Sequence, residues 1–475
     1  MDIKKRIKTK KALVISLVTL VTVLIGSLDT GKTNAKTVKL FDYENLNSAD
    51  DVVPRLFGVS SKMMLSQGVE YKRYRFRLED SYIIANVIEA DITDPDYRAV
   101  IMKAGSNTSE VERLHDMVDI SDSMSNYLML GAVNGSFWRA YTNSPMGPTI
   151  IDGEIVELKN VKNWNSAFFD ENGKLYIDGF ETRCEIRNSD SLIYTAYYTN
   201  RRDDSAGVAI YNSYVGDRIP YVSQWKIDRM FREAWRDIKY KDKTEAEFDS
   251  VKLKQELIRV KRLSDFDYGF PKISLRYITK PAMNKEFSAV VTAYQKRGSM
   301  NVPEDGIVMT FGIGTNREII PRIGDTVYIK YATAGYSDTV FYNGLCGTPR
   351  LVSEGRVIVD SPRDNFRSKR FVKGDLRRTA IGTNKDKTKI YLVTTEGTNE
   401  RAKISGADLK QLAYIMRRIG AYDALNLDGG GSTVMVIDGM NIMNRGCPEC
   451  SRELSVGIGI ARRKLSVKSL LDKLM

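Results

Sequence analysis

The chain has 475 residues, 42% of them hydrophobic and 28% charged, which suits a globular protein with a sizeable core in one large or two to three ordinary domains. The net charge is +12, but the basic residues are scattered and no motif interleaves them with aromatic residues, so nucleic acid is not an expected partner. His115 is the single histidine of the sequence, which excludes a histidine-rich zinc site. Its amphipathic surroundings, TSEVERLHDMVD, indicate a structural role.

The first 35 residues are typical of an export segment. A basic start, MDIKKRIKTKK, precedes the uncharged apolar run ALVISLVTLVTVLIG at residues 12–26. This run is shorter than the roughly 20 residues that a spanning helix needs. Residues 1–35 are therefore predicted to be a signal peptide cleaved after Ala35 or, alternatively, an uncleaved N-terminal membrane anchor. In both cases the body of the protein is expected outside the cytoplasm, either secreted or in the cell envelope.

The charge outside this segment is also positive. Residues 1–35 hold seven Lys or Arg and two Asp, and removing that excess of five leaves +7 on the rest of the chain. A moderate positive charge outside a cell suits association with an anionic wall polymer or a membrane surface. An anionic wall polymer is therefore a candidate partner, and membrane contact is expected only through residues 12–26 if they are retained.

The main domain is expected at residues 69–462, after a linker or N-terminal extension at 36–68. Apolar runs such as YIIANVIEADI and YLMLGAVNGSF, separated by glycine and asparagine, predict strands, and one helix is expected at about 110–119. Helical spacing within dense mixed charge predicts a helical insertion at about 221–283. The expected fold class is α+β, a mixed and largely antiparallel twisted sheet with flanking helices and this insertion.

Clear turn and cap patterns follow the insertion. A hairpin is predicted with its turn at residues 384–387. A helix is expected to begin at Ser405, in an S-x-x-D arrangement that ends at Asp408, and to close at Gly420. Strands at 424–427 and 434–437 come next. The tail, 463–475, is predicted to be a short basic amphipathic helix, interpreted as a packed or solvated end rather than a membrane anchor.

Four cysteines are present: Cys184, Cys346, Cys447 and Cys450. The close pair, CPEC, allows a tight disulfide, half a zinc site or two free thiols. The sequence has no second CxxC and no partner histidine, which disfavours zinc. A structural role is the preferred interpretation, so no metal site is predicted from the cysteines.

The segment LNLDGGGSTVMVIDG, residues 425–439, is unusual. Each glycine inside a regular element costs roughly 0.5–1 kcal/mol relative to alanine, so three in a row indicate a backbone with a special task. Asp428 is predicted at the rim of a sheet, where a buried strand ends. Backbone without Cβ atoms can approach an oxyanion closely. The loop is not a nucleotide-binding P-loop, because GxxxxGK[ST] is absent.

Several segments, taken in order, carry a family resemblance: GAVNGSFW (131–138), MGPTIIDGEIV (146–156), AIYNSYVG (209–216), VPEDGIVMTFGIG (302–314), GDTV (324–327), RRTAIG (377–382), NLDGGGST (426–433) and SRELSVGIGI (451–460). With this order and spacing, residues 69–216 and 286–462 resemble the phosphodiester glycosidase family, whose bacterial relatives include exported proteins linked to exopolysaccharides. Three positions depart from the family pattern. Ser136 follows the Asn-Gly pair, where relatives often have another residue, so this position is interpreted as tolerant. Glu396 stands where relatives tend to have aspartate, and Ser451 where many have glutamate.

The resemblance implies a hydrolase that splits an N-acetylglucosamine-1-phospho-R type of phosphodiester at the anomeric carbon. A phosphomonoester leaves without an acid's help because its second pKa is about 6, so one carboxylate and a phosphate cradle suffice. Asp428 is predicted to be the base or nucleophile, with Glu396 as the second carboxylate if one is needed. Trp138 is a candidate ring platform. The predicted substrate-binding residues are Asn134, Gly135, Arg378, Thr379, Gly429, Gly430, Gly431, Ser432, Thr433 and Arg452.

No cofactor and no metal is predicted. Calcium stays open, because Asp325, Asp428 and backbone oxygens are suitable ligands, although no EF-hand spacing is present. The expected partner is a carbohydrate phosphodiester of cell-envelope glycopolymer or exopolysaccharide. The alternative is a non-catalytic cell-wall polysaccharide-binding protein on the same fold. A third hypothesis is a phosphodiesterase that cuts P–O instead of C–O.

Overall fold

The computed structural model describes residues 53–139, 142–189, 191–202, 205–219, 268–359, 369–443 and 451–464. All of these lie in one unit of the chain, Asp42–Met475. The predicted export segment, the CPEC pair, the tail from residue 465 and residues 221–267 of the predicted helical insertion lie outside the described residues. Among the described residues, no helix is long and apolar enough to cross a membrane.

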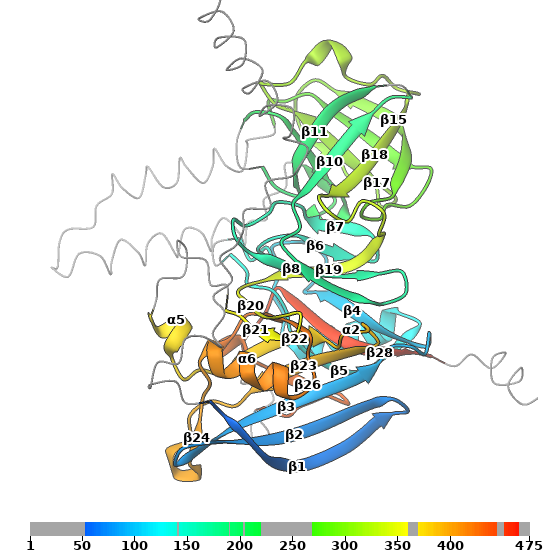
Figure 1. Cartoon of the computed structure of the whole chain (residues 1–475). Coiled ribbons are helices and arrows are strands. Elements are labelled where there is room, and N and C mark those ends of the chain that lie inside the picture. The colour runs from blue at the N-terminus through cyan, green and yellow to red at the C-terminus, as the bar shows by residue number, and fades with distance from the viewer. Residues whose placement is uncertain are drawn as a thin grey trace, which may run out of the picture. The chain divides into compact units, whose positions relative to one another are not determined.

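A large sheet forms one layer of the structure (Figure 1). Its strands run in the order β1-β2-β3-β23-β22-β25-β20-β21, and β24 pairs with β3. The bounds are β1 (Arg55–Ser66), β2 (Val69–Leu78), β3 (Ser81–Asp91), β20 (Arg350–Ser353), β21 (Arg356–Val357), β22 (Arg378–Thr383), β23 (Lys389–Thr395), β24 (Ile404–Ser405) and β25 (Asp423–Asn426). The first strand, β1, lies inside the predicted N-terminal extension.

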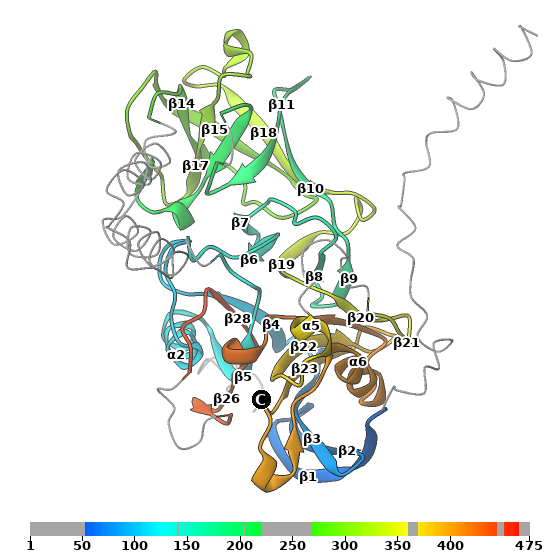
Figure 2. The ribbon, with the colours of Figure 1, turned by 90° about the vertical axis from the view of Figure 1, so that its left-hand side faces the viewer.

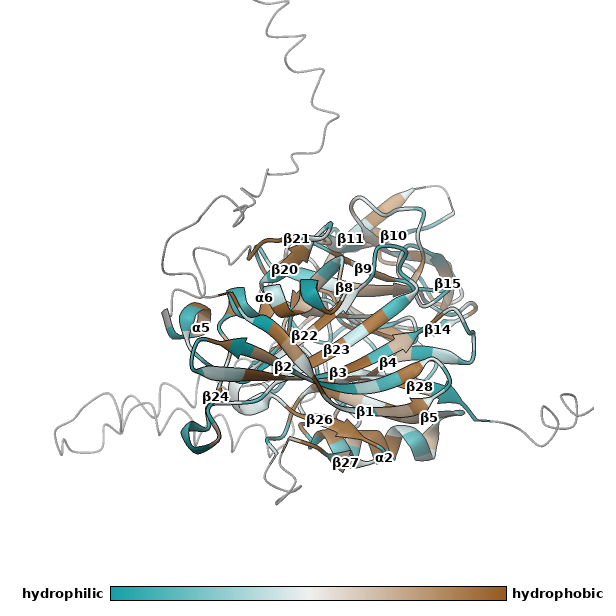
Figure 3. Ribbon diagram, turned by 60° about the horizontal axis from the view of Figure 1, so that its bottom comes forward, coloured by the Kyte–Doolittle hydropathy of each residue, from teal (hydrophilic) through white to brown (hydrophobic). Residues whose placement is uncertain are grey.

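A second sheet packs against the large one, and the two enclose a core of aliphatic side chains such as Ile88, Leu392 and Ile458. Its order is β27-β26-β5-β28-β4. The bounds are β4 (Tyr97–Lys103), β5 (Tyr127–Asn134), β26 (Met435–Ile437), β27 (Met440–Asn441) and β28 (Val456–Arg463). Figure 3 shows hydrophobic residues recurring along the strands of these sheets. This arrangement is a β-sandwich, in which successive side chains along each strand alternate between the inner and the outer face of the sheet.

Two helices cover the outer faces of the sandwich. Helix α6 (Leu409–Arg418) packs its apolar side on the large sheet, and α2 (Leu114–Met124) packs on the second sheet. A short helix, α5 (Lys369–Lys373), lies near α6. The middle of each sheet therefore has both faces covered, which explains why central strands such as β22 and β25 are buried along their whole length, whereas the edge strand β1 is mostly exposed.

A smaller sheet, ordered β7-β6-β19-β8-β9, separates the sandwich from a closed barrel (Figures 1 and 2). Its strands are β6 (Thr149–Ile151), β7 (Glu154–Glu157), β8 (Asn165–Asp170), β9 (Leu175–Asp178) and β19 (Phe341–Gly347). The barrel order is β10-β11-β12-β17-β14-β15-β18. Its strands are β10 (Thr182–Arg187), β11 (Leu192–Thr199), β12 (Val208–Tyr211), β14 (Lys272–Tyr277), β15 (Glu286–Gln295), β17 (Gly306–Phe311) and β18 (Thr326–Thr333). A further pair joins β13 (Arg218–Ile219) to β16 (Met300–Asn301).

The predicted α+β fold class is wrong. The protein is mostly β, with a closed seven-stranded barrel and several sheets instead of one sheet with flanking helices. The predicted helical insertion also ends too late, because β14 lies within its last residues. Pairing between the named strands is antiparallel except for β11–β12 and β24–β3. Strand-rich segments were therefore recognised, but their division into several sheets was not.

Local patterns were more informative than the global one. The turn at 384–387 is confirmed, since β22 and β23 flank it and Lys387 N donates to Asn384 O at 3.1 Å. Helix α6 begins at Leu409, four residues after the predicted start at Ser405, because Asp408 is its N-cap and shares a capping box with Gln411, while Ser405 lies in β24. Gly420, at φ +110°, follows the end of the helix as expected. Cys184 and Cys346 are buried and unbridged.

Candidate active site

The glycine loop joins the two sheets of the sandwich. Strand β25 of the large sheet ends at Asn426, Asp428 follows two residues later, and Gly430–Ser432 forms a single 3-10 turn. The chain then enters β26, which pairs with β5 of the second sheet. Asp428 is therefore at the rim of the large sheet, where the backbone crosses from one layer to the other.

Asn134, at the end of β5, holds this crossing in place. Its Nδ2 donates to Asp428 O at 2.7 Å, and its Oδ1 accepts from Thr379 Oγ1 at 2.7 Å and from Val434 N at 3.2 Å. Gly135 O accepts from Asp428 N at 3.2 Å. Asn134 and Thr379 are both almost fully buried. Asn134, Gly135 and Thr379 thus lie at the loop: Asn134 and Gly135 hold its backbone, and the Thr379 hydroxyl holds Asn134.

Two of the three glycine N–H groups in the loop donate hydrogen bonds within the protein, and the third does not. Gly429 N donates to its neighbour's carboxylate, Asp428 Oδ1, at 2.9 Å, and Gly430 N donates to Arg377 O at 2.8 Å. The N–H of Gly431, an exposed residue, has no acceptor among the described residues. Of the three predicted oxyanion donors, Gly431 therefore retains a free N–H group.

Two buried hydroxyls add donors to the loop. Ser432 is 2% exposed and Thr433 is 3% exposed. Thr433 Oγ1 has no partner within the part of the chain that the structure describes, whereas the Ser432 hydroxyl faces the Asp428 carboxylate and lowers its pKa. A buried hydroxyl without a partner is costly, so such groups tend to mark places where a ligand or water binds. Together with Gly431 N, they form a set of donors suited to a phosphate or a sugar hydroxyl.

Glycine is needed at positions 430 and 431 for different reasons. Gly430 is needed for the backbone conformation, and Gly431 for the close approach of a ligand. Gly430 has φ +61°, whereas Gly431 lies outside the left-handed region, and a Cβ at either position meets nothing within 4 Å. Gly430→Ala is expected to cost about 1–2 kcal/mol of unfolding free energy. Gly431→Ala is expected to leave stability unchanged but to weaken ligand binding at the loop. Urea unfolding and ligand titration of both variants check this, and equal destabilisation by both would contradict it.

The Asp428 carboxyl is the central titratable group of the loop. Its side chain is partly exposed, yet the surrounding protein raises the pKa of Asp428 by desolvation. The hydroxyl of Ser432, the N–H of Gly429 and the charge of Arg452 each oppose that rise in pKa. A carboxylate with a raised pKa in such a place suits a general base or nucleophile.

Arg452 joins this group from a different segment. It is exposed, and its guanidinium lies 5.4 Å from the ring centroid of Trp138, a cation–π contact. Because it also acts on the pKa of Asp428, the structure brings Asp428, Arg452 and Trp138 together. This places a cation suitable for phosphate and an aromatic ring suitable for a sugar face beside the carboxylate.

Arg378 is not brought to the loop in the predicted way. Its side chain is 1% exposed, its Nε donates to Ala407 O at 2.8 Å, and its Nη2 donates to Phe371 O and Gly374 O at 2.8 and 2.9 Å. Burial lowers the pKa of Arg378 to about 10. Adjacent strand residues point to opposite faces, so Arg378 faces α5 and α6 while Thr379 faces Asn134. Its guanidinium therefore anchors the backbone around α5.

Glu396 is also held elsewhere. It forms an ion pair with Arg73 of β2, with Arg73 Nη2 2.8 Å from Glu396 Oε1. β22 lies between β23, which precedes Glu396, and β25, which precedes Asp428. Two strand spacings thus separate the two carboxylates, on the order of 10 Å. The predicted second carboxylate is not paired directly with the first.

Two further candidate residues were not recognised from the sequence. Asn426 and Thr348 are almost fully buried, and Asn426 Nδ2 donates to Thr348 O at 2.7 Å. Asn426 Oδ1 and Thr348 Oγ1 have no partner among the described residues. Asn426 lies in the same motif as Asp428, so its polarity in an apolar strand was an available clue. Thr348 lies 78 residues before Asn426 in the sequence, and no local pattern indicates it.

The structure gives no support to a calcium site shared by Asp325 and Asp428. Asp325 lies in the turn before β18 of the barrel, where its Oδ2 accepts from Arg322 N at 2.7 Å, whereas Asp428 follows β25 of the sandwich. The described residues contain no cluster of three or more His, Cys, Asp or Glu side chains able to hold a metal ion.

The loop thus places the Asp428 carboxylate beside the Arg452 guanidinium and the Trp138 ring. Residues 282–461 match the model of the NAGPA family, described as phosphodiester glycosidase, which confirms the predicted resemblance for this part of the chain. The matched range contains Asp428, the glycine loop and Arg452. Motifs between 131 and 216 lie outside the match. No curated protein sequence matches the chain.

Solved structures give fold-level similarity. A hypothetical protein from Synechocystis has a TM-score of 0.59 and 17% identity, over 86% of this chain and 64% of that one. This chain thus spans less than two thirds of the Synechocystis structure. A protein from Burkholderia pseudomallei that is described as exported has a TM-score of 0.51 and 14% sequence identity, over 80% of this chain and 74% of that one. A third structure is the catalytic domain of zebrafish N-acetylglucosamine-1-phosphodiester alpha-N-acetylglucosaminidase, auto-inhibited by its pro-peptide. It has a TM-score of 0.39 and 13% sequence identity, over 86% of this chain and 88% of that one.

Proposed function

We propose that the protein is an exported hydrolase that cleaves a sugar-1-phosphodiester, of the N-acetylglucosamine-1-phospho-R type, at the anomeric carbon. The observation that carries the proposal is the Asp428 carboxylate, whose pKa is raised, at the start of a glycine loop within the family match. The family is one of hydrolases that act on phosphodiester-linked sugars, which supports the reaction class. The export-like N-terminal sequence and the positive charge support a substrate in cell-envelope glycopolymer or exopolysaccharide.

The site residues have complementary roles in this reaction. Asp428, in its ionised form, either takes a proton from a water molecule that attacks C1, or attacks C1 itself to form a glycosyl ester that water then hydrolyses to free sugar. The bond between C1 and the phosphate oxygen breaks, and its electron pair leaves on the phosphomonoester, which needs no proton from the protein. Arg452 and the donors of Gly431, Ser432 and Thr433 stabilise the departing phosphate. Trp138 supports the apolar face of the sugar.

The proposal is tested by incubating the purified protein with alpha-linked N-acetylglucosamine-1-phospho-alkyl substrates in heavy-oxygen water. Free sugar carrying the label means C–O cleavage, as proposed. Label in the phosphate product means P–O cleavage and would replace the glycosidase by a phosphodiesterase. Absence of release from a panel of sugar phosphodiesters would contradict both reactions.

Arg452 provides a pH test of the same site. Because its positive charge opposes the rise in the pKa of Asp428, Arg452→Gln is expected to raise that pKa further. Asp428 must be ionised to act, so activity is lost as pH falls through its pKa. The acid limb of the kcat/KM profile is therefore expected at higher pH in Arg452→Gln than in wild type. A variant with lower kcat/KM but an unmoved acid limb would contradict electrostatic coupling to Asp428.

One observation favours a second function. Glu396 is engaged by Arg73, and Ser451 replaces the glutamate of many relatives, so the site offers fewer free carboxylates than the family pattern. A non-catalytic protein that binds wall polysaccharide through the same loop fits this feature. It is distinguished by tight polymer binding without turnover.

A further inference from the structure

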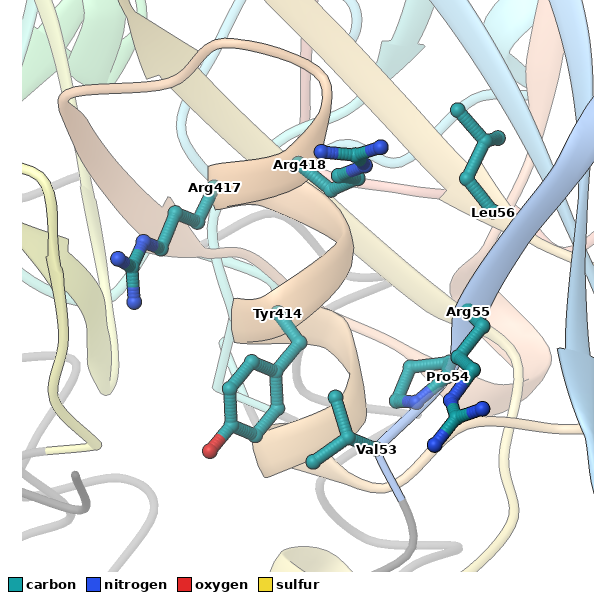
Figure 4. A pocket seen from close by; sticks show the side chains of 7 residues that line it. All are labelled: Val53, Pro54, Arg55, Leu56, Tyr414, Arg417 and Arg418. Carbon is teal, nitrogen blue, oxygen red and sulfur yellow. The ribbon is translucent and has the colours of Figure 1, made fainter. Parts of the chain in front are cut away.

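A groove lies on the large-sheet side of the sandwich, between α6 and the start of β1 (Figure 4). Its volume is about 460 Å³, and its lining residues are Val53, Pro54, Arg55, Leu56, Tyr414, Arg417 and Arg418. Figure 4 shows the helix residues on one side and the strand residues on the other. The groove therefore joins two segments about 360 residues apart in sequence, Arg55 and Arg417.

The described residues that line this groove carry charge of one sign. Three of them are arginines, all exposed, and none of the described lining residues is acidic. Arg55 also lies directly opposite Arg77 in the pairing of β1 with β2, and like charges in such pairs repel. The C-terminal carbonyls of α6 offset part of the charge of Arg417 and Arg418. The remaining positive potential suits an anion.

The rest of the lining is apolar or aromatic. Val53 and Leu56 are exposed large hydrophobic side chains, and Tyr414 presents a partly exposed ring. Arginine matches phosphate geometry well, and an aromatic or aliphatic surface suits the carbon face of a sugar or polyol. The lining thus matches a chain in which phosphates alternate with polyol or sugar units better than a small inorganic anion.

The groove is separate from the glycine loop. Helix α6 ends at Arg418 and leads into the start of β25 at Asp423, whereas Asp428 follows the other end of that strand. Five residues of extended chain, about 17 Å, separate the start of β25 at Asp423 from Asp428. A ligand in the groove is therefore not a ligand of Asp428, although one long polymer can contact both places.

We propose that this groove is an accessory binding site for the phosphate groups of an anionic polymer chain. The identity of that polymer as the protein's substrate rests on the proposed function, but the site itself does not. Binding there holds the polymer on the protein between cleavage events and raises the local concentration of its phosphodiester bonds near the catalytic loop.

The test uses the full chain and a fluorescently labelled linear glycerol-phosphate decamer. The variant Arg55→Gln/Arg417→Gln/Arg418→Gln removes the three groove charges. Its control, Arg297→Gln/Arg317→Gln/Arg322→Gln, removes three exposed arginines from barrel turns, with the same change in net charge. We expect the groove variant to bind the decamer at least about tenfold more weakly than wild type, and the control to bind within about twofold. A neutral glucan oligomer is expected to bind neither protein.

Equal affinity of wild type and groove variant would overturn the proposal. Equal loss of affinity in the groove variant and the control would overturn it as well, because it means general charge attraction. The sequence just before the groove is acidic, with Asp42, Glu44, Asp50 and Asp51. Binding that appears only after these four are neutralised would also overturn it and assign the groove to the chain's own segment. Hydrolysis of short phospho-alkyl substrates is expected to survive in the groove variant, so failure here is distinguishable from failure of the proposed function.

Discussion

Asp428→Asn is expected to lower the rate of sugar release from N-acetylglucosamine-1-phospho-alkyl substrates by at least about a thousandfold. The amide keeps the size of the side chain and can still accept from Gly429 N, but it cannot take a proton or attack carbon. Because the remaining loop donors are unchanged, the affinity for product phosphomonoester is expected within about threefold of wild type. Single-turnover rates and product titration measure the two quantities separately.

The loss of activity in Asp428→Asn should not come from unfolding. Desolvation raises the pKa of Asp428 in the folded protein above its value in the unfolded chain. Between those two pKa values the folded state holds the proton more tightly, so stability falls as pH rises through this window and stays lower above it. Asparagine removes that penalty. The unfolding free energy of the Asp428→Asn protein at neutral pH is therefore expected to equal or exceed that of wild type.

The matched control is Asp438→Asn. Asp438 is exposed in the β26–β27 turn with φ +48°, a conformation that asparagine also tolerates. This variant is expected to retain wild-type rates. If both variants lose activity alike, the effect is not specific to the loop carboxylate. If Asp428→Asn stays active while folded, the catalytic carboxylate must be sought elsewhere, with Glu396 the next residue to replace.

The sequence located the loop because its signals are local. Three glycines between apolar runs require a turn, and the buried strand before them sets Asp428 at a sheet rim. The predicted helix start failed for an equally local reason. Ser405 and Asp408 are both good N-cap residues, and tertiary pairing of Ser405 with Ile83 in β3 decided between them. A single sequence does not contain that pairing in any readable form.

The division into sheets depends on contacts between distant segments. Barrel strands β10 and β18 pair across more than 140 residues, as in Cys184 with Tyr331, and both read as ordinary alternating strands. Asp428 and Arg452 come from the same third of the chain, but Trp138 and Asn134 reach them only through the second sheet. The motifs include Asn134 and Thr379, which lie at the loop, but also Arg378, which is held elsewhere. They do not show that Asn134 holds the loop backbone or that the Thr379 hydroxyl donates to Asn134 Oδ1.

Arg378 shows how a motif residue can be important without binding substrate. It lies in the RRTAIG segment, and its guanidinium donates to three backbone carbonyls, of Ala407, Phe371 and Gly374. Arg378→Met leaves those buried carbonyls without their charged donor. We expect a loss of about 2–4 kcal/mol in unfolding free energy by urea titration. Arg378→Lys is expected to recover only part of it, because one ammonium does not span the three acceptors.

The control for Arg378→Met is Arg356→Met, which removes an exposed arginine whose ion pair with Glu354 spans 3.5 Å. Exposed pairs of this kind contribute about 0–1 kcal/mol, so this variant should unfold close to wild type. Under conditions where Arg378→Met remains folded, its KM for the phospho-alkyl substrate is expected to stay near the wild-type value. A stable Arg378→Met protein with a strongly raised KM would show instead that Arg378 turns from the α5 carbonyls to grip the substrate phosphate, as the motif alone suggested.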